Sequence, residues 1–216
     1  MRVITHPRGE VARRVNSVIM STIKEQKRRL RSEIRQRRTS VSCQERALSD
    51  RNIQKNLRSL LDQLYPKAVC AFSPMPGEPG GPDLPQYLTS VLPSDVPIFL
   101  PRVISQADRS MEWVQFSGEL EVSHWGIPEP VGEPVSDAFA YEPLMILPAL
   151  AIDYDGRRLG QGGGFYDTVF ARKPRGIISC AIVDDIEIID HVPTEDHDLA
   201  VDYIISGAAV VQKKGI

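Results

Sequence analysis

The first third of the chain carries apolar side chains at helical spacing. Residues 8–38 are rich in Arg, Lys, Glu and Gln, and their apolar positions recur mostly every third or fourth residue. A short polar break follows, and in it Ser42 stands three residues before Glu45, the spacing of a capping box. The pattern predicts a long basic helix and then a second helix that runs to about Leu64 and ends before Pro66.

Beyond Pro66 the pattern changes to short apolar runs separated by turns rich in Pro and Gly. The runs are Ala68–Ser73, Pro97–Leu100, Met111–Phe116, Leu144–Ile152, Ile177–Val183 and Asp202–Ile205. Several have no alternation of apolar and polar residues, which is typical of strands covered on both faces. Short helices are expected at Asp83–Leu92 and Phe165–Arg172, and a surface excursion at 117–143. The pattern therefore predicts an α/β domain with a mostly parallel sheet.

Composition places few restrictions on this picture. With 216 residues, 42% of them hydrophobic, the chain fits one domain with a packed core. The longest apolar run, 144–152, is too short for a membrane span, so no membrane association is expected. The arginine-rich start has no following apolar segment, which argues against a secretory signal and leaves an organelle transit peptide open.

Charge is distributed unevenly along the chain. Residues 1–58 contain 16 Lys and Arg against 5 Asp and Glu, whereas residues 59–216 contain 10 against 23. A basic arm invites a nucleic-acid or membrane-surface interpretation, but the acidic remainder would repel a polyanion. We therefore expect no nucleic-acid partner and interpret the basic helix face as a solvated surface or a pocket for a small anion.

The cysteines indicate the compartment. Cys43, Cys70 and Cys180 are too few and too scattered for a disulfide framework or a metal cluster. Cys70 and Cys180 lie within apolar runs, which suits buried thiols in a reducing environment. A cytoplasmic location is the expectation.

A glycine-rich block at residues 147–167, LPALAIDYDGRRLGQGGGFYD, is the strongest local feature. An apolar run leads into a turn at Asp155-Gly156, and four glycines follow within five positions: Gly160, Gly162, Gly163 and Gly164. Such glycines let peptide N–H groups approach an anion closely, so the block favours a phosphate site. Hairpin or linker material is the alternative. The spacing matches neither the P-loop nor the dinucleotide motif.

Five segments together resemble one family. They are KRRLR (27–31), SPMPGE (73–78), WGIPEP (125–130), RLGQGGGFYD (158–167) and VPTEDHDLAVDYII (192–205). In this order they are similar to the 5-formyltetrahydrofolate cyclo-ligase family, also called methenyltetrahydrofolate synthetase, over residues 24–206. The resemblance implies a three-layer single domain at 21–216 with an extension at 1–20. The fold would be related to sugar-phosphate isomerases and CoA-transferases.

The resemblance also implies a reaction. ATP would phosphorylate the formyl oxygen of 5-formyltetrahydrofolate, and N10 would then attack to give 5,10-methenyltetrahydrofolate, ADP and phosphate. ATP and Mg²⁺ would be required, and the protein would act as a monomer on small molecules. A protein of the same fold that binds ATP or another phosphate ligand without ligase activity is the alternative.

Roles carry over to matching positions. Catalytic residues would be Lys27, Arg31 and Glu78, with Asp167 and Asp198 binding magnesium. The implied ATP-binding residues are Lys27, Arg31, Arg158, Gly160, Gly162, Gly163, Gly164 and Tyr166. The implied folate-binding residues are Phe72, Glu78, Trp125, Gln161, Gly163 and Phe165.

Simpler interpretations of these side chains stay open. Lys27 and Arg31 share a helix face but could be surface charges. Asp167 could be a helix-start carboxylate, and Trp125 could fill the edge of the core. The chain also departs from the family pattern, with PGGPD at 79–83 in place of a V-D-T-like segment and Gln161 where relatives carry Tyr or Arg.

Overall fold

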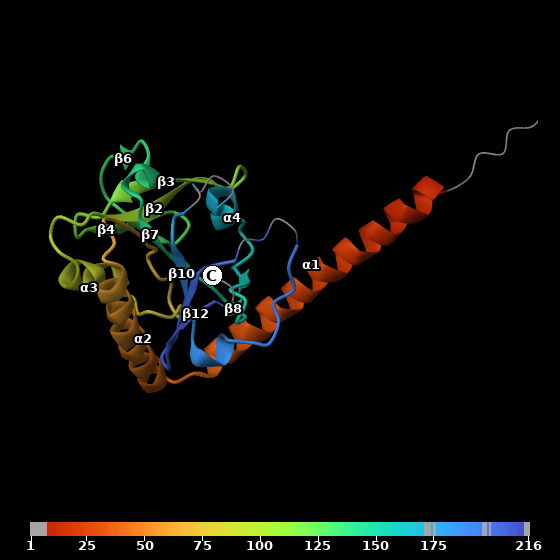
Figure 1. The fold of residues 1–216 in the computed structure, drawn as a ribbon, viewed down its shortest axis with the longest axis horizontal. Helices are drawn as coiled ribbons and strands as arrows, with labels where there is room; N and C mark the ends of the chain where they lie inside the picture. The colour runs from red at the N-terminus through yellow and green to blue at the C-terminus, as the bar shows by residue number, and fades with distance from the viewer. Residues whose placement is uncertain (1–7, 171–173, 175, 196–197, 199, 214–216) are drawn as a thin grey trace, which may run out of the picture.

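The computed structural model describes residues 8–170, 174, 176–195, 198 and 200–213, with residues 8–21 and 170 described by their backbone alone. Its helices are α1 (Arg8–Ser40), α2 (Cys43–Leu64), α3 (Leu84–Val91) and α4 (Phe165–Phe170), with 3-10 turns η1 (Ala138–Tyr141) and η2 (Asp185–Glu187). Figure 1 shows α1 against the domain with its C-terminal half and extending beyond it with its N-terminal half.

The two N-terminal helices confirm the predicted pattern. The Ser42 hydroxyl accepts a hydrogen bond from the Glu45 N–H, and the Glu45 carboxylate accepts one from the Ser42 N–H. This capping box fixes the start of α2 after the break. At the other end Tyr65 takes a left-handed conformation and closes the helix just before Pro66.

Eight strands form the main sheet, in the order β12-β11-β10-β7-β1-β2-β3-β6. Their bounds are β1 Val69–Cys70, β2 Ile98–Ser105, β3 Ser110–Gln115, β6 Pro134–Val135, β7 Leu144–Pro148, β10 Ser179–Ile182, β11 Tyr203–Ile205 and β12 Val210–Gln212. The four pairings among β11, β10, β7, β1 and β2 are parallel, and the three pairings at the edges are antiparallel. The sheet is therefore mixed and mostly parallel, as predicted.

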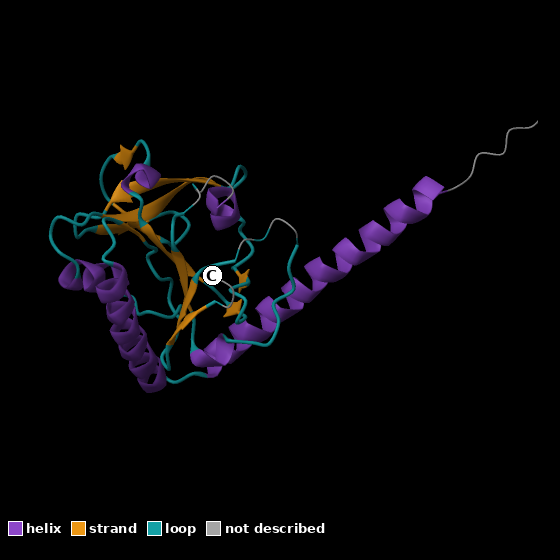
Figure 2. Cartoon of the chain, in the orientation of Figure 1, coloured by secondary structure: helices purple, strands orange, loops and turns teal. Residues whose placement is uncertain are grey.

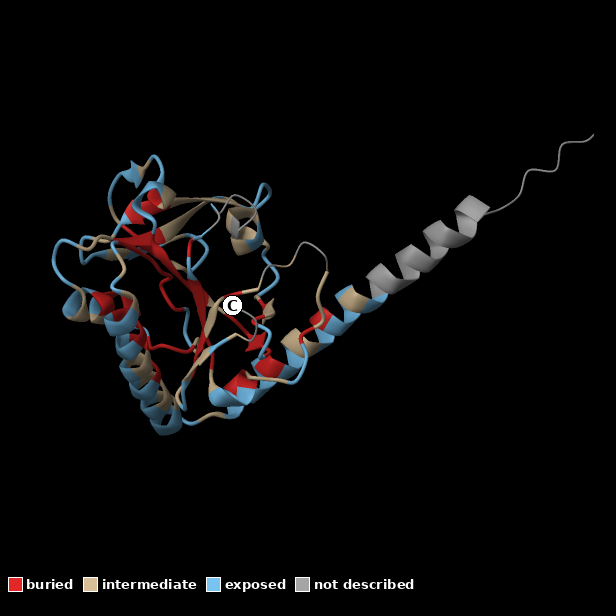
Figure 3. Cartoon of the chain, in the orientation of Figure 1, coloured by how far each residue is buried: buried red, intermediate tan, exposed pale blue. Residues whose placement is uncertain are grey.

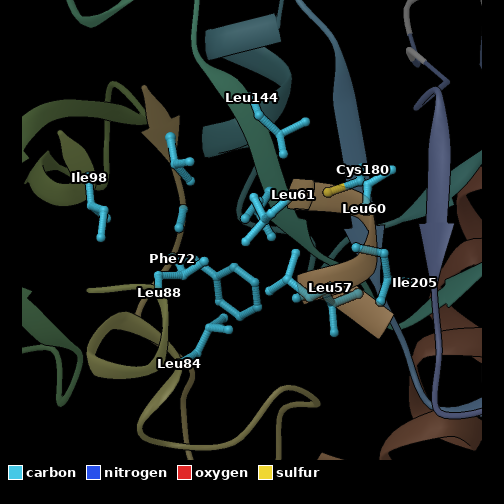
Figure 4. Packing of buried hydrophobic residues seen from close by; sticks show 14 of the residues in the cluster. Leu57, Leu60, Leu61, Phe72, Leu84, Leu88, Ile98, Leu144, Cys180 and Ile205 are labelled. Atoms are coloured by element: carbon cyan, nitrogen blue, oxygen red, sulfur yellow. The ribbon is translucent and has the colours of Figure 1, made fainter. Parts of the chain in front are cut away.

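Helices cover both faces of this sheet, which gives three layers (Figure 2). On one face α2 and α3 pack on β1, β2, β7 and β10, with Leu57, Leu61 and Leu88 in the interface. Figure 4 shows this cluster, with Cys180 and Leu144 contributed by the sheet. On the other face η1 and α4 pack on Phe99, Met145 and Ala181. Burial on both sides explains why these strands lack alternation.

Several expected boundaries differ in the structure. The run 144–152 is split into β7 and a separate β8 (Ala151–Ile152), which pairs with β9 (Arg158–Leu159) in an antiparallel hairpin. Pro148 ends β7 because proline has no N–H to donate to the ladder. The hairpin turn lies at the predicted Asp155-Gly156 position.

Shorter elements were also missed. The excursion at 117–143 contains β4 (Leu120–Val122), β5 (Pro128–Pro130), β6 and η1, and β6 joins the main sheet. The last strand, β12, was not predicted either. These strands have two or three residues, which is too short for a periodic signal. The expected end of the fourth helix at Arg172 lies outside the described residues.

A buried ion pair anchors the C-terminal end of α1. Arg38 donates to both carboxylate oxygens of Glu187, at 2.6 and 2.9 Å, and also to the carbonyl oxygen of Ala149 at 2.8 Å. The Glu187 side chain is 1% exposed, and its burial raises the pKa of that carboxyl group against the opposing effect of Arg38. Figure 3 shows buried positions on the part of α1 that lies against the domain, and among the described α1 side chains these are Lys27, Ile34 and Arg38.

We predict that Arg38→Ala lowers the free energy of unfolding by about 3–5 kcal/mol, because it leaves the Glu187 carboxylate buried without its partner. Urea unfolding followed by circular dichroism measures the change. Arg37→Ala, an exposed neighbour on the same helix, is the control and should alter stability by less than about 0.5 kcal/mol. Equal effects of the two substitutions would contradict the anchoring role.

Candidate functional site

Most of the residues singled out by sequence gather at one end of the sheet. Glu78 lies in the connection that follows β1, and the glycine-rich loop follows β7 through the β8–β9 hairpin. Arg109, in the turn between β2 and β3, lies against this loop. The carboxyl ends of parallel strands are the usual position of ligand sites in open α/β sheets.

Lys27 connects α1 to the C-terminal segment. Its amine lies 2.5 Å from a carboxylate oxygen of Asp198 and 3.0 Å from one of Glu195, and Lys27 is only 8% exposed. Asp198 in turn accepts a hydrogen bond from the N–H of Glu195. Lys27 is thus a buried, paired cation, and the surface-charge alternative is wrong for it.

Asp153 fixes the turn that precedes the glycines. Its buried carboxylate accepts hydrogen bonds from the N–H groups of Asp155, Arg157 and Val192, and it pairs with the Arg157 guanidinium at 2.9 Å. The bond to Val192 ties this turn to the segment that leads to Glu195. One carboxylate therefore orients both the loop and the acidic partners of Lys27.

At three of the four glycines, an arginine side chain occupies the space that a side chain at the glycine would need. A Cβ atom added at Gly160 would lie 2.9 Å from the Arg158 guanidinium, one at Gly162 would lie 3.3 Å from that of Arg31, and one at Gly164 would lie 2.9 Å from that of Arg109. Arg31 also donates to the Gly160 carbonyl at 2.9 Å. Gly162 and Gly164 have φ values of +100° and +75°.

These arginines come from three different elements: Arg31 from α1, Arg109 from the β2–β3 turn and Arg158 from β9. Glycine allows the close approach of a guanidinium group at all three positions, and at Gly162 and Gly164 it also allows the positive φ. The loop is therefore packed against three arginine side chains, unlike a solvated linker. Converging guanidinium groups suit a polyanion such as a nucleotide triphosphate.

The electrostatics of the site reflect its burial. Desolvation lowers the pKa of Arg31, the neighbouring Arg35 lowers it further, and Asp167, Asp198 and Glu195 act in the opposite direction. Desolvation likewise lowers the pKa of Arg158, which Asp167 opposes. Burial raises the pKa of the Tyr166 hydroxyl well above its usual range, so it is a neutral hydrogen-bonding group at physiological pH. The Arg158 guanidinium lies 5.8 Å from the centre of the Tyr166 ring.

Glu78 lies across from the glycine-rich loop. Gln161 donates from its side-chain amide to Glu78 at 2.9 Å, and Arg35 on α1 donates to both the backbone oxygen and the side-chain oxygen of Gln161, at 2.9 and 3.0 Å. The structure thus brings together Glu78 and Gln161, two of the predicted folate-binding residues. Phe165, a third, lies in van der Waals range of Gly163 in the same loop, where a Cβ would meet its ring at 3.0 Å.

The segment 79–83, whose sequence departs from the family pattern, is hydrogen-bonded to side chains of α2. Arg46 donates to the Gly77 carbonyl at 2.9 Å, Asp50 accepts from the Gly80 N–H at 3.0 Å, and Gln54 donates to the Gly80 carbonyl at 3.0 Å. Burial raises the pKa of the Asp50 carboxyl group. The loop after Glu78 is therefore fixed by side chains on one face of a helix, although its sequence departs from the family pattern.

Two predicted folate-binding aromatics lie elsewhere. Phe72 is 3% exposed and packs in the core beside α2 and α3, as Figure 4 shows. Trp125 is 37% exposed in the turn between β4 and β5, where its ring lies tilted against that of His124 with ring centres 3.8 Å apart. The described contacts do not connect Trp125 with the glycine-rich loop.

The predicted magnesium residues differ in availability. Asp167 is 49% exposed and lies 3.4 Å from the Arg158 guanidinium, whereas one Asp198 oxygen is already held by Lys27. Among the described residues no group of three or more His, Cys, Asp or Glu side chains is placed to hold a metal ion. Two carboxylates fit an ion that takes its other ligands from phosphate and water.

Four functional-site candidates were missed by the sequence analysis: Arg35, Arg109, Asp153 and Glu195. Arg35 follows Arg31 by one helical turn, so the helical spacing could have indicated it. The other three act through tertiary contacts that no local pattern signals.

All three cysteines are free, and Cys70 and Cys180 are buried as predicted.

Two further observations concern the rest of the molecule. A cavity of about 550 Å³ lies at the opposite end of the sheet, where Lys67, Leu144 and Ile178 precede or begin their strands. Within the described part of the chain, no helix combines the length and the apolar character needed to cross a membrane.

Comparison with known proteins gives one consistent result. The model of the 5-formyltetrahydrofolate cyclo-ligase family matches residues 23–207. A 5-formyltetrahydrofolate cyclo-ligase of Mycolicibacterium smegmatis is 30% identical, over 65% of this chain and 73% of its own, and one of Mus musculus is 26% identical, over 85% and 95%. The structure of a 5,10-methenyltetrahydrofolate synthetase of Aquifex aeolicus superimposes with a TM-score of 0.71 at 26% identity, covering 88% of this chain and 94% of that one. The resemblance seen in the motifs is confirmed.

We predict that Gly156→Ala destabilises the protein more than Gly126→Ala. Both glycines have similar positive φ values, +79° and +75°, so both substitutions carry the backbone strain. An added Cβ at Gly156 would lie 2.3 Å from the Val201 carbonyl oxygen, whereas nothing lies within 4 Å at Gly126.

The difference in the free energy of unfolding should be about 1–3 kcal/mol, the usual cost of overpacking. Chemical denaturation of both variants measures it. Equal losses would show that the C-terminal segment is not packed on this turn.

Proposed function

Because the chain belongs to the 5-formyltetrahydrofolate cyclo-ligase family, we propose that it converts 5-formyltetrahydrofolate and ATP into 5,10-methenyltetrahydrofolate, ADP and phosphate. The observation that carries this proposal is the packing of Arg31, Arg109 and Arg158 on the glycines of one loop at the carboxyl end of the sheet. Such an arrangement suits the charge of a triphosphate, and Glu78, which accepts a hydrogen bond from Gln161 of the same loop, would contact the second substrate.

In this mechanism the formyl oxygen attacks the γ-phosphorus of ATP, and the bond to the bridging oxygen breaks to release ADP. The phosphorylated formyl group is an iminium-like electrophile, which N10 attacks at carbon. The C–O bond then breaks, phosphate leaves, and N10 loses its proton. Catalysis of phosphoryl transfer rests on positioning and on stabilisation of charge. Lys27, Arg31 and Arg158 would supply cations, while the amides of Gly160, Gly162, Gly163 and Gly164 and the neutral Tyr166 hydroxyl would supply donors.

We propose that Glu78 contacts the folate together with Gln161, Gly163 and Phe165. Support comes from the hydrogen bond that joins Glu78 to Gln161. Trp125 is proposed as a pterin contact on the resemblance alone. Phe72 is proposed only as a residue that supports the pocket wall from the core, since it is 3% exposed.

We propose that Mg²⁺ accompanies ATP, with Asp167 and Asp198 as its protein ligands. The donors are hard oxygens, which fits this ion. When bound, the ion would neutralise phosphate charge. The Lys27 amine pairs with the Asp198 carboxylate, so the ion pair positions the two side chains together.

We also propose that the protein is a monomer that acts in the cytoplasm without a nucleic-acid or membrane partner. The acidic balance of residues 59–216 and the buried free thiols support this proposal. Residues 1–20 are proposed as an extension outside the cyclo-ligase domain, since the family match begins at residue 23.

The test of the function is spectroscopic. Purified protein mixed with 5-formyltetrahydrofolate and MgATP should form the methenyl chromophore, and omission of either ATP or magnesium should abolish it. A folded protein that binds ATP but forms no chromophore would instead be a nucleotide-binding relative without ligase activity.

We predict that Lys27→Gln lowers kcat/KM for ATP by about 100-fold, the usual loss when one charge-stabilising group is removed. The matched control is Lys24→Gln, an exposed lysine on the same helix, which should retain full activity. Thermal unfolding of both variants separates catalysis from stability, because Lys27→Gln also removes the ammonium group that pairs with Glu195 and Asp198. A folded Lys27→Gln enzyme with normal turnover would remove Lys27 from the mechanism.

A further inference from the structure

Arg35 forms the first member of a hydrogen-bonded chain that crosses the site. The chain runs from the Arg35 guanidinium to the Gln161 side-chain oxygen at 3.0 Å, and from the Gln161 side-chain nitrogen to Glu78 at 2.9 Å. The second Glu78 oxygen accepts from the Met75 N–H at 3.0 Å. Three separate segments, α1, the glycine-rich loop and the connection after β1, are joined by these bonds.

The chemistry of the three groups gives the chain a fixed direction. A guanidinium only donates hydrogen bonds, and an ionised carboxylate only accepts them. The amide between them satisfies both neighbours in one orientation, with its oxygen toward Arg35 and its nitrogen toward Glu78. In the opposite orientation its oxygen would face the carboxylate and its NH₂ group would face the guanidinium, so both contacts would be repulsive.

Arg35 also holds the backbone at this point. Its guanidinium donates to the Gln161 carbonyl oxygen at 2.9 Å, in addition to the side-chain bond. Two acceptors of one residue bound by one planar guanidinium restrict both the loop and the side chain. With Met75 N–H on its second oxygen, the Glu78 carboxylate has a bond on each oxygen and a defined plane.

We propose that Arg35 is a positioning residue for the folate substrate, acting through Gln161 on the Glu78 carboxylate. This inference rests on the proposed function, since it assigns Arg35 to the folate side of the same site. Arg35 differs in this from Arg31, one turn earlier on α1, which contacts the loop at Gly160 and Gly162.

The charge of Arg35 makes the two substrates respond differently. Arg35 is exposed and lies near enough to Arg31 to lower the pKa of that guanidinium. Removing Arg35 therefore removes a like charge near Arg31, while the Arg31 guanidinium keeps its place at Gly160 and Gly162. The Glu78 carboxylate, in contrast, loses the group that orients its partner.

The experiment measures both substrates in Arg35→Ala. We expect KM for 5-formyltetrahydrofolate to rise by about 5–10-fold, the loss that corresponds to one typical intramolecular hydrogen bond. KM for ATP should stay within about twofold of wild type. A rise in KM for ATP with an unchanged KM for folate would make Arg35 a phosphate contact and overturn the proposal.

A double-mutant cycle tests the route through Gln161. Arg35→Ala added to Gln161→Ala should raise KM for folate little beyond Gln161→Ala alone, because the side-chain link to Glu78 is already broken and only the bond of Arg35 to the backbone oxygen of residue 161 remains to be lost. Additive effects would mean that the two residues act independently, which contradicts the proposal. Arg35→Lys should recover part of the loss, since one donor can still reach Gln161.

Controls separate this inference from the proposed function. Arg28→Ala removes an exposed arginine of α1 whose carboxylate partner is Glu25 on the same helix, and it should leave both KM values unchanged. Calorimetric binding of 5-formyltetrahydrofolate to the full chain without ATP gives a second readout of Arg35→Ala. If wild-type protein forms no product, the function fails; if it does but Arg35→Ala neither weakens folate binding nor raises KM, the role of Arg35 alone fails.

Discussion

The ion pairs of Lys27 with Glu195 and Asp198 join helix α1 to the C-terminal segment in one site. Charge is segregated along the sequence, with an excess of cations in the first 58 residues and an excess of anions after them. The contact between α1 and the C-terminal segment is where these charges meet, at 2.5 and 3.0 Å in a largely buried place. Burying a lysine is costly unless its charge is paired, so the helix and the acidic turn depend on each other.

Apolar packing and a second ion pair complete this contact. Ile34 of α1 is buried with Leu150 and Leu159 of the β8–β9 hairpin, and Arg38 reaches Glu187 one turn beyond. Apolar contacts supply most of the free energy of association, while the charged pairs set the rotation of the helix about its axis. That rotation is what directs Arg31 and Arg35 toward the glycine-rich loop.

Much of the fold could be predicted from the sequence because its strongest signals are local. The capping box at Ser42 and the helical spacing before it depend on neighbouring residues, and both were confirmed. The pairing of β6 with β3 depends on which distant strand is available, and the sequence does not encode that locally. The split after β7, in contrast, has a local cause in Pro148, which the apolar run 144–152 concealed. The site divides in the same way. The spacing of Lys27 and Arg31 indicated a shared helix face, whereas Asp153 and Arg109 acquire their places only through tertiary contacts.

Three side chains of α2 bind the loop after β1, and this restricts where residues can be inserted into or deleted from α2. Arg46, Asp50 and Gln54 are four residues apart and hold Gly77 and Gly80 from one face of the helix. A single-residue insertion or deletion between Arg46 and Gln54 would turn part of this row by about 100°. Length variation in α2 is therefore confined to its ends, while the loop itself can diverge in side chains because α2 binds mainly its backbone.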